Sequence, residues 1–211
     1  MIIQLPIQKI LTNSAKIEID WMREPEKETV RDLLNAVILE GKTYPQEQPL
    51  SESEFAAYWL SSDAFVARWI DDKKTSAPGE VLGAFYLKPN FPGRSSHICN
   101  AGFIVQRRHR GQGIGRVMGE TMLEIAASRG YRGVMFNLVF ATNIPSLNLW
   151  QSLEFQTIGR IPAAAKLVDG QVVDALMLYR SLAWSKSYYP RPITKHYPCN
   201  SATIATDKEL W

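Results

Sequence analysis

Cysteine and histidine are scarce in this chain of 211 residues, with two and three copies respectively. Cys99 and Cys199 cannot build a disulfide framework or a zinc site, although one disulfide between them is a possible alternative. No stretch approaches the roughly 18 apolar residues of a membrane span. The first residues lack the basic and long apolar regions of a secretory signal. These absences predict a protein without a metal or membrane contact, working in the reducing cytoplasm.

Net charge is also small, because 24 Lys and Arg face 21 Asp and Glu, for a total of +3. Acidic residues are missing between Glu80 and Glu120 and again from Ile125 to Leu153. The first of these stretches holds six basic residues: Lys88, Arg94, Arg107, Arg108, Arg110 and Arg116. An anionic ligand fits this pattern, because carboxylates would repel it. Buried strands, which exclude carboxylates, explain it equally well.

Nucleic acid is a poor partner for this chain. Arg107, Arg108 and Arg110 have the right charge to bind phosphates. However, the net charge is low, and aromatic residues do not alternate with the basic ones as they do in single-strand binding surfaces. We therefore expect no nucleic-acid role.

Hydrophobic residues make up 45% of the chain, enough for a buried core. Their spacing alternates between the strand period of two and the helix period of 3.6. Strands are predicted at 16–21, 64–70, 81–87, 97–105, 134–140, 157–161 and 172–179, and helices at 30–38, 51–59, 113–130 and 145–153. This order predicts a mixed α/β (α+β) domain around one sheet over residues 1–182. Residues 183–211, with three prolines, are predicted to pack on the surface or on a partner subunit of a homodimer.

The most specific local feature is a glycine-rich turn between a strand ending near Val105 and the helix from Gly113. It reads Arg107-Arg108-His109-Arg110-Gly111-Gln112-Gly113-Ile114-Gly115-Arg116. Glycines let the backbone approach a ligand closely, and the helix N-terminus favours an anion such as a pyrophosphate. The turn lacks the Gly-Lys-Ser/Thr of a P-loop and the third glycine of a dinucleotide fingerprint.

The remaining pattern, Arg-x-x-Gly-x-Gly, resembles the acyl-CoA pyrophosphate loop of the GNAT superfamily of N-acetyltransferases. The resemblance implies a mostly antiparallel central sheet with splayed strands and flanking helices, and acetyl-CoA as cosubstrate. It also implies a set of residues that bind acetyl-CoA: Phe103, Ile104, Val105, Arg110, Gly111, Gln112, Gly113, Ile114, Gly115, Arg116 and Asn143.

Two residues depart from the GNAT pattern near the segment 149–155. Trp150 stands where the family usually has the tyrosine that protonates the departing thiolate, and an indole N–H is no usable proton source. Either the thiolate leaves unassisted or another group supplies the proton. Glu154 replaces the usual glycine, which affects only the local turn.

Longer stretches between Gly41 and Ala164 are similar to the yeast L-azetidine-2-carboxylate N-acetyltransferases, which acetylate proline analogues. They include Gly41-Lys42-Thr43-Tyr44-Pro45-Gln46, Lys88-Pro89-Asn90, Cys99-Asn100-Ala101-Gly102-Phe103 and Asn137-Leu138-Val139-Phe140. The resemblance implies that Asn100 and Asn137 contact the amine and carboxylate of the substrate. His97 is the titratable candidate for a general base, and a water chain held by backbone carbonyls and Asn100 is equally plausible.

The sequence therefore predicts an acetyl-CoA-dependent N-acetyltransferase for a small amino-acid-like amine, and the resemblance points to a proline analogue. Alternative GNAT substrates are a peptide N-terminus, a polyamine or an aminoglycoside, although a polyamine site should be acidic. A non-catalytic acyl-CoA binding module is the alternative of another class.

Overall fold

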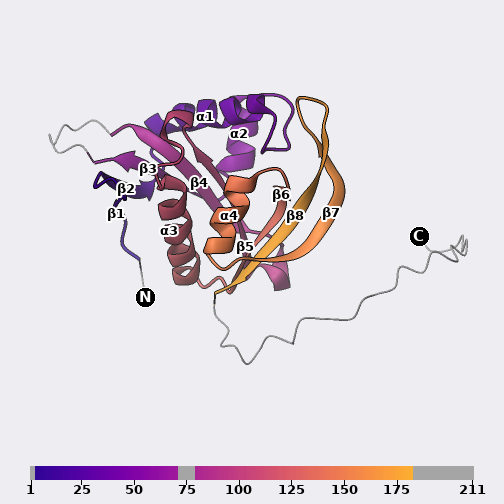
Figure 1. Cartoon of the computed structure of the whole chain (residues 1–211). Helices are drawn as coiled ribbons and strands as arrows, with labels where there is room; N and C mark the ends of the chain where they lie inside the picture. Colours follow the sequence, from indigo (N-terminus) through magenta and orange to yellow (C-terminus); the bar gives the residue numbers. More distant parts are fainter. Residues whose placement is uncertain (1–2, 71–78, 183–211) are drawn as a thin grey trace, which may run out of the picture.

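One mixed sheet of eight strands organises the protein, and Figure 1 shows it as a twisted layer running through the molecule. The computed structural model describes residues 3–70 and 79–182, so the extension predicted at 183–211 lies outside the described residues. The strand order is β1-β2-β3-β4-β5-β6-β8-β7. The strands are β1 (Ile7–Ile10), β2 (Lys16–Trp21), β3 (Asp63–Trp69), β4 (Val81–Pro89), β5 (Ile98–Val105), β6 (Gly133–Phe140), β7 (Gln156–Lys166) and β8 (Val172–Ser181).

Four α-helices cover the two faces of the sheet. They are α1 (Lys27–Glu40), α2 (Glu52–Trp59), α3 (Ile114–Ser128) and α4 (Ile144–Ser152). One core packs α3 and α4 against residues such as Phe85 and Phe136, and a second packs α1 and α2 against Ala84, Tyr86 and Ile104. Neighbouring strand residues thus serve opposite cores, as the alternation of a pleated strand requires. The predicted α+β class is confirmed.

Helix boundaries follow the local signals in the sequence. Ser51 and Glu54 form the predicted capping box, with the Glu54 N–H donating to Ser51 Oγ over 3.3 Å. Helix α1 ends where Gly41 adopts the left-handed conformation at φ 62°. These ends fix the segment 41–51, which crosses from α1 to α2.

The contact between β5 and β6 is parallel and very short. It comprises two residue pairs, Ile98 with Gly133 and Cys99 with Val134, after which the strands separate. The Trp150 ring of α4 lies between them, 4.9 Å from Phe103 of β5 and 4.5 Å from Phe136 of β6 between ring centroids. An indole of this size keeps the two strands too far apart for backbone hydrogen bonds. The predicted splayed strands are confirmed.

Two parts of the sheet differ from the prediction: one strand was not predicted, and another is longer than predicted. Strand β1 was not predicted; it pairs antiparallel with β2 at the sheet edge. Strand β7 runs over eleven residues and includes Pro162, and its pairing with β8 shifts between Ile161 and Ala165. An edge strand tolerates such a proline because one side of its ladder has no partner.

A buried ion cluster joins the first strands to the start of α1. The side chain of Arg68 is fully buried at a bulge of β3, and Glu26 is 3% exposed. Arg68 Nη2 donates to Glu26 Oε2 over 3.0 Å, and its Nε donates to Glu26 Oε1. Arg68 also donates to Glu18 and to the Trp21 carbonyl, over 2.9 and 2.8 Å. This satisfied network holds α1 at a fixed place on the sheet.

Removing the carboxylate of Glu26 should leave the Arg68 charge buried with a partner missing. We expect Glu26→Ala to lower the free energy of unfolding by about 3–5 kcal/mol, measured by urea denaturation. Glu24→Ala is the matched control, because Glu24 is 82% exposed and pairs only with Lys27 in a surface contact. The control should change stability by less than about 0.5 kcal/mol. Equal effects of the two substitutions would contradict a stabilising role of the cluster.

Candidate active site

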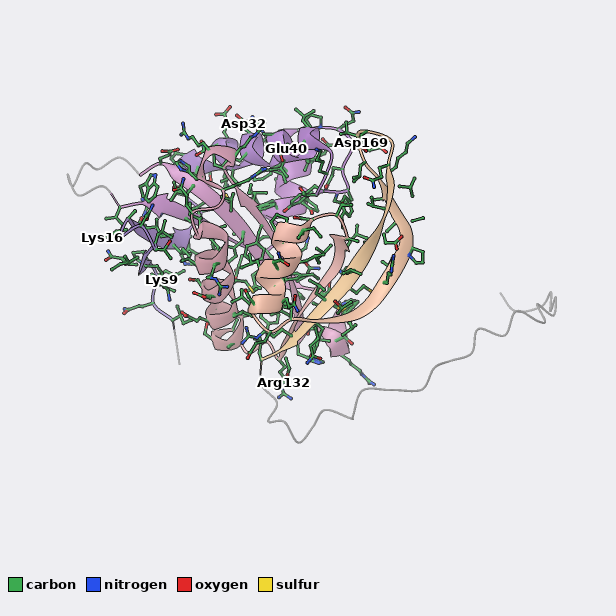
Figure 2. All side chains as sticks on the ribbon, in the orientation of Figure 1. Lys9, Lys16, Asp32, Glu40, Arg132 and Asp169 are labelled. Atoms are coloured by element: carbon green, nitrogen blue, oxygen red, sulfur yellow. The ribbon has the colours of Figure 1, made fainter. Side chains whose placement is uncertain are left out.

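A cleft of about 950 Å³ opens where β5 and β6 separate. Its walls come from β5, β6 and the starts of α3 and α4, and from the segment after α1. The turn between β7 and β8 contributes Leu167, Asp169 and Gln171. Figure 2 shows Asp169 of this turn and Glu40 at the end of α1 at the top of the molecule. The Val168 N–H donates to the Gly41 carbonyl over 3.1 Å, so the turn is tied to the end of α1 beside the cleft.

The predicted glycine turn forms one end of the cleft. A short 3-10 helix, η3 (Arg107–His109), precedes it, and α3 begins after Gly113. Gly111 and Gly113 adopt φ values of 78° and 86°, which L side chains rarely take. No atom lies within 4 Å of the place where a Cβ would stand on either residue. The first N–H groups of α3 therefore border open space at the positive end of the helix dipole, where an anion is favoured.

The basic side chains of the turn already hold carboxylates from other parts of the chain. Arg110 Nη1 donates to Glu40 over 2.9 Å, and Arg116 Nη1 donates to Glu120 over 3.4 Å. The arginines pair as Arg108 with Glu80, Arg110 with Glu40, and Arg116 with Glu120, and His109 Nε2 lies 3.1 Å from Glu80 Oε1. The acid-free stretches of the sequence are thus not acid-free in space. Gln112 bonds the Arg108 carbonyl and does not line the cleft, so it braces the turn.

Every second residue of β5 directs its backbone N–H and C=O groups toward the gap between β5 and β6. Gln106 N donates to the Leu82 carbonyl of β4, so even-numbered residues pair with β4 and Phe103 and Val105 face the other side. The Phe103 carbonyl accepts from the Tyr44 hydroxyl over 3.1 Å, and the Val105 carbonyl accepts from Arg110 Nε over 3.2 Å. The predicted Ile104 also borders the cleft, but its side chain is buried in the α1–α2 core and its backbone faces β4.

Asn100 and Asn137 lie close together at the point where the strands separate. Both line the cleft and lie on the α1–α2 face of the sheet, on β5 and β6 respectively. They meet through Asn90, the residue that follows β4. Asn137 Nδ2 donates to Asn90 Oδ1 over 2.6 Å, Asn90 Nδ2 donates to Asn137 Oδ1 over 2.9 Å, and Asn100 Nδ2 donates to Asn90 Oδ1 over 3.1 Å. The spacing brought the two predicted amides together, and the structure adds the third.

Tyr58 and Tyr86 line the cleft beside these amides, and Lys88 packs against both rings. Lys88 stands opposite Asn100 in the β4–β5 register, and its Nζ lies 4.6 and 5.2 Å from the ring centroids of Tyr86 and Tyr58. Lys88 Nζ donates to the Tyr58 carbonyl over 3.3 Å and forms no ion pair with any carboxylate of the described residues. Desolvation lowers the pKa of Lys88 from its usual value. A partly buried cation thus lies next to the neutral amides, although Lys88 itself does not line the cleft.

Two further predicted residues lie in contrasting places. His97 is exposed in the turn before β5 and does not line the cleft, because it precedes the short section where β5 and β6 pair. The structure therefore does not bring it to the amides. Asn143 lines the cleft and is also the N-cap of α4, since its Oδ1 accepts from the Ser146 N–H over 3.3 Å.

Comparison with known proteins decides the family. The model of the "Acetyltransferase (GNAT) family" matches residues 30–155, which is more than half of the chain. The chain belongs to the GNAT family. Among curated GNAT relatives, N-acetyltransferase aca1 of Schizosaccharomyces pombe is 38% identical over 149 residues, which make up 66% of this chain and 71% of that protein. The protein is thus an N-acetyltransferase of the GNAT type.

Solved GNAT structures share the fold. A GNAT acetyltransferase from Kribbella flavida has a TM-score of 0.72 and 28% identity, covering 79% of this chain and 98% of that one. A phosphinothricin acetyltransferase from Sinorhizobium meliloti, solved in complex with AcCoA, has a TM-score of 0.70 and 19% identity, covering 86% and 96%. At that identity the second likeness concerns the fold alone. In the described ranges, no helix is long and apolar enough to cross a membrane.

The two departures from the GNAT pattern have visible structural roles. Trp150 is 4% exposed, and its indole N–H donates to Ser146 Oγ over 2.9 Å. Its place between β5 and β6 is that of a wedge rather than of a proton donor. Glu154 adopts φ 61°, a conformation that a glycine takes without strain, and Arg180 Nη2 contacts its carboxylate at 3.2 Å.

Several residues in or next to the cleft were not predicted, because they were read singly. Tyr86, Lys88 and Asn90 follow each other at intervals of two at the end of β4 and just after it, so they lie on one face of the sheet. That period was visible in the sequence and was used only to predict the strand. Glu40 and Asp169 reach the cleft from distant segments, which no local pattern indicates.

The tyrosines of the wall should stay neutral in alkaline solution. Burial raises the pKa of Tyr44 well above its usual value, and it also raises the pKa of Tyr86. Because these pKa values are higher in the folded than in the unfolded state, the neutral tyrosines contribute their full stabilisation below about pH 10. This contribution is lost as the pH rises further. We expect Tyr44→Phe to leave the tyrosinate absorbance of the folded protein at about pH 11 unchanged. In denaturant, the same variant should lose one of eight tyrosinates. A lower absorbance of the folded variant would contradict a neutral Tyr44.

Proposed function

We propose that this GNAT enzyme transfers the acetyl group of acetyl-CoA to the amine of a small amino-acid-like substrate, a proline analogue such as L-azetidine-2-carboxylate. The observation that carries the proposal is the meeting of Asn100 and Asn137 in the cleft at the point where β5 and β6 separate, with Lys88 opposite Asn100 on β4 but outside the cleft lining. Neutral amides can accept from an amine and donate to a carboxylate, and the lysine adds a positive charge.

The cleft residues fit acetyl-CoA at the end that holds the glycine turn. Open space above Gly111 and Gly113 and the free N–H groups of α3 suit a pyrophosphate. Phe103 and Val105 offer backbone groups along the gap, where the amide groups of the CoA arm would bind, with Asn143 beside them. When bound, acetyl-CoA supplies an activated thioester. Because Arg110 and Arg116 are paired with glutamates, we assign most of the anion recognition to the backbone.

The reaction is a direct acyl transfer. The neutral amine nitrogen attacks the carbonyl carbon of the thioester, an N–C bond forms, the C–S bond breaks, and the amine proton passes to water. Among the described residues, the carboxylates lining the cleft are Glu40, bound to Arg110, and Asp169, on the β7–β8 turn. We therefore assign proton removal to water held by Asn100 and backbone carbonyls. The thiolate leaves unassisted, as its modest pKa of about 8.5 permits.

The shape and charge of the acceptor region support a small substrate. The bond between Val168 and Gly41 brings the β7–β8 turn over the region beside Tyr44, which limits the room for a peptide chain. A polyamine bound at the amides would lie near the charge of Lys88 rather than near a cluster of carboxylates. Both features favour a zwitterion over a polycation or a protein N-terminus.

The glycine turn can be tested with a pair of matched variants. Gly113 and Gly130 flank α3 with φ values of 86° and 84°, and a Cβ would meet no atom within 4 Å at either place. Gly113→Ala and Gly130→Ala should each cost about 1–2 kcal/mol of stability through backbone strain. Only Gly113→Ala should raise the KM for acetyl-CoA, by about tenfold, because Gly130 lies at the far end of the helix. Equal KM values would place the pyrophosphate elsewhere.

The substrate class can be tested by measuring thiol release with matched amines. We expect wild-type enzyme to acetylate azetidine-2-carboxylate far better than azetidine, and to prefer both over polyamines. Lys88→Met keeps the apolar stem and removes the charge, so it should reduce the preference for the carboxylated amine by about tenfold while leaving azetidine unaffected. Asn137→Ala should lower turnover of the best amine. Failure of every amine to release thiol would contradict the proposed function.

A further inference from the structure

Asn90 lies outside the cleft wall and yet bonds both amides that face the acceptor. Its Oδ1 accepts from Asn137 and Asn100 over 2.6 and 3.1 Å, and its Nδ2 donates to Asn137 over 2.9 Å. It does not line the cleft, so it has no direct access to a substrate there. Any effect of Asn90 on the reaction must therefore pass through its two partners.

The hydrogen bonds of Asn90 cross the sheet at the place where β5 and β6 stop pairing. Asn90 follows β4 and Asn137 belongs to β6, while β5 lies between these two strands. Backbone pairing between β5 and β6 has already ended at Cys99 and Val134. Two hydrogen bonds join Asn90 to Asn137, so these side chains bridge the separated strands. Asn100 donates to the same Asn90 oxygen.

This bridge also decides which polar atoms the two amides present. Because both amide nitrogens turn to the Asn90 oxygen, the Oδ1 of Asn100 is turned away from Asn90. Each side-chain NH₂ group retains a second N–H for another partner. Asn100 can then accept from an amine while Asn137 donates to a carboxylate. A freely rotating amide would present its oxygen and nitrogen in either arrangement.

We propose that Asn90 is a positioning residue of the acceptor site, which orients Asn100 and Asn137 toward a substrate with an amine next to a carboxylate. The proposal rests on the proposed function for its effect on turnover. The orientation of the two amides by Asn90 does not depend on the proposed function. Asn90 acts on the binding of the amine and leaves the glycine turn, at the other end of the cleft, unchanged.

A double-mutant cycle on the full chain tests this role, using Asn90→Ala, Asn137→Ala, the double variant and the wild type. Asn90→Ala should raise the KM for azetidine-2-carboxylate by about tenfold, as expected for loss of the hydrogen bonds that orient one amide. The KM for acetyl-CoA should stay unchanged. In the Asn137→Ala background the same substitution should have a much smaller effect. Additive effects, or an equal rise in both KM values, would overturn the proposal.

A measurement made without substrate tests the orienting role of Asn90 independently of the proposed function. The side-chain amide signals of Asn100 and Asn137 in ¹⁵N-labelled protein should shift in Asn90→Ala. Asn148→Ala, on the exposed side of α4 and outside the cleft, is the control and should leave them in place. Unchanged signals in Asn90→Ala overturn the orienting role. If wild-type enzyme acetylates no amine, the proposed function fails, and the amide signals still decide whether Asn90 orients its partners.

Discussion

The site depends on how early β5 and β6 stop pairing. Two residue pairs join the strands, and beyond them the Trp150 ring packs against Phe103 of β5 and Phe136 of β6. A buried indole contacting Phe103 and Phe136 gains more from apolar burial than the lost strand hydrogen bonds cost. The unpaired backbone of β5 is thereby left with donors and acceptors that need partners. Tyr44 and Arg110 satisfy two of its carbonyls, and the gap opens to the cleft.

Each face of the sheet makes a different contribution to this gap. The face that carries α3 and α4 provides the aromatic wedge and the helix N-terminus, which suit a bulky anion. The face that carries α1 and α2 provides amides, tyrosines and Lys88, which suit a small polar acceptor. Strand alternation explains the division, because neighbouring residues such as Phe85 and Tyr86 project to opposite faces. The two reactants of an acyl transfer can thus meet through the sheet without sharing a binding surface.

Most of the fold could be predicted from the sequence, because its signals are local. The apolar stripe of α1, the capping box at Ser51 and the glycine turn before α3 each specify their own element. Strand β1 was missed because four residues with alternating partial burial carry little hydrophobic signal. Of the candidate site, the glycine turn and the two cleft asparagines were found. Asn90 was not found, because its hydrogen bonds to Asn100 and Asn137 depend on how three strands are aligned. His97 lies outside the cleft, and the periodicity of a strand does not specify which of its residues reach the cleft.

Gly41 ends α1 and also touches the turn that limits the cleft. A Cβ at this position would stand 2.4 Å from the Val168 Cβ, and the φ of 62° already favours glycine. The residue that caps α1 thus stands directly against the β7–β8 turn. Any side chain there would push the turn outward and widen the opening beside Tyr44. The width of the cleft at this end is therefore limited partly by the absence of one methyl group at a position that does not itself line the cleft.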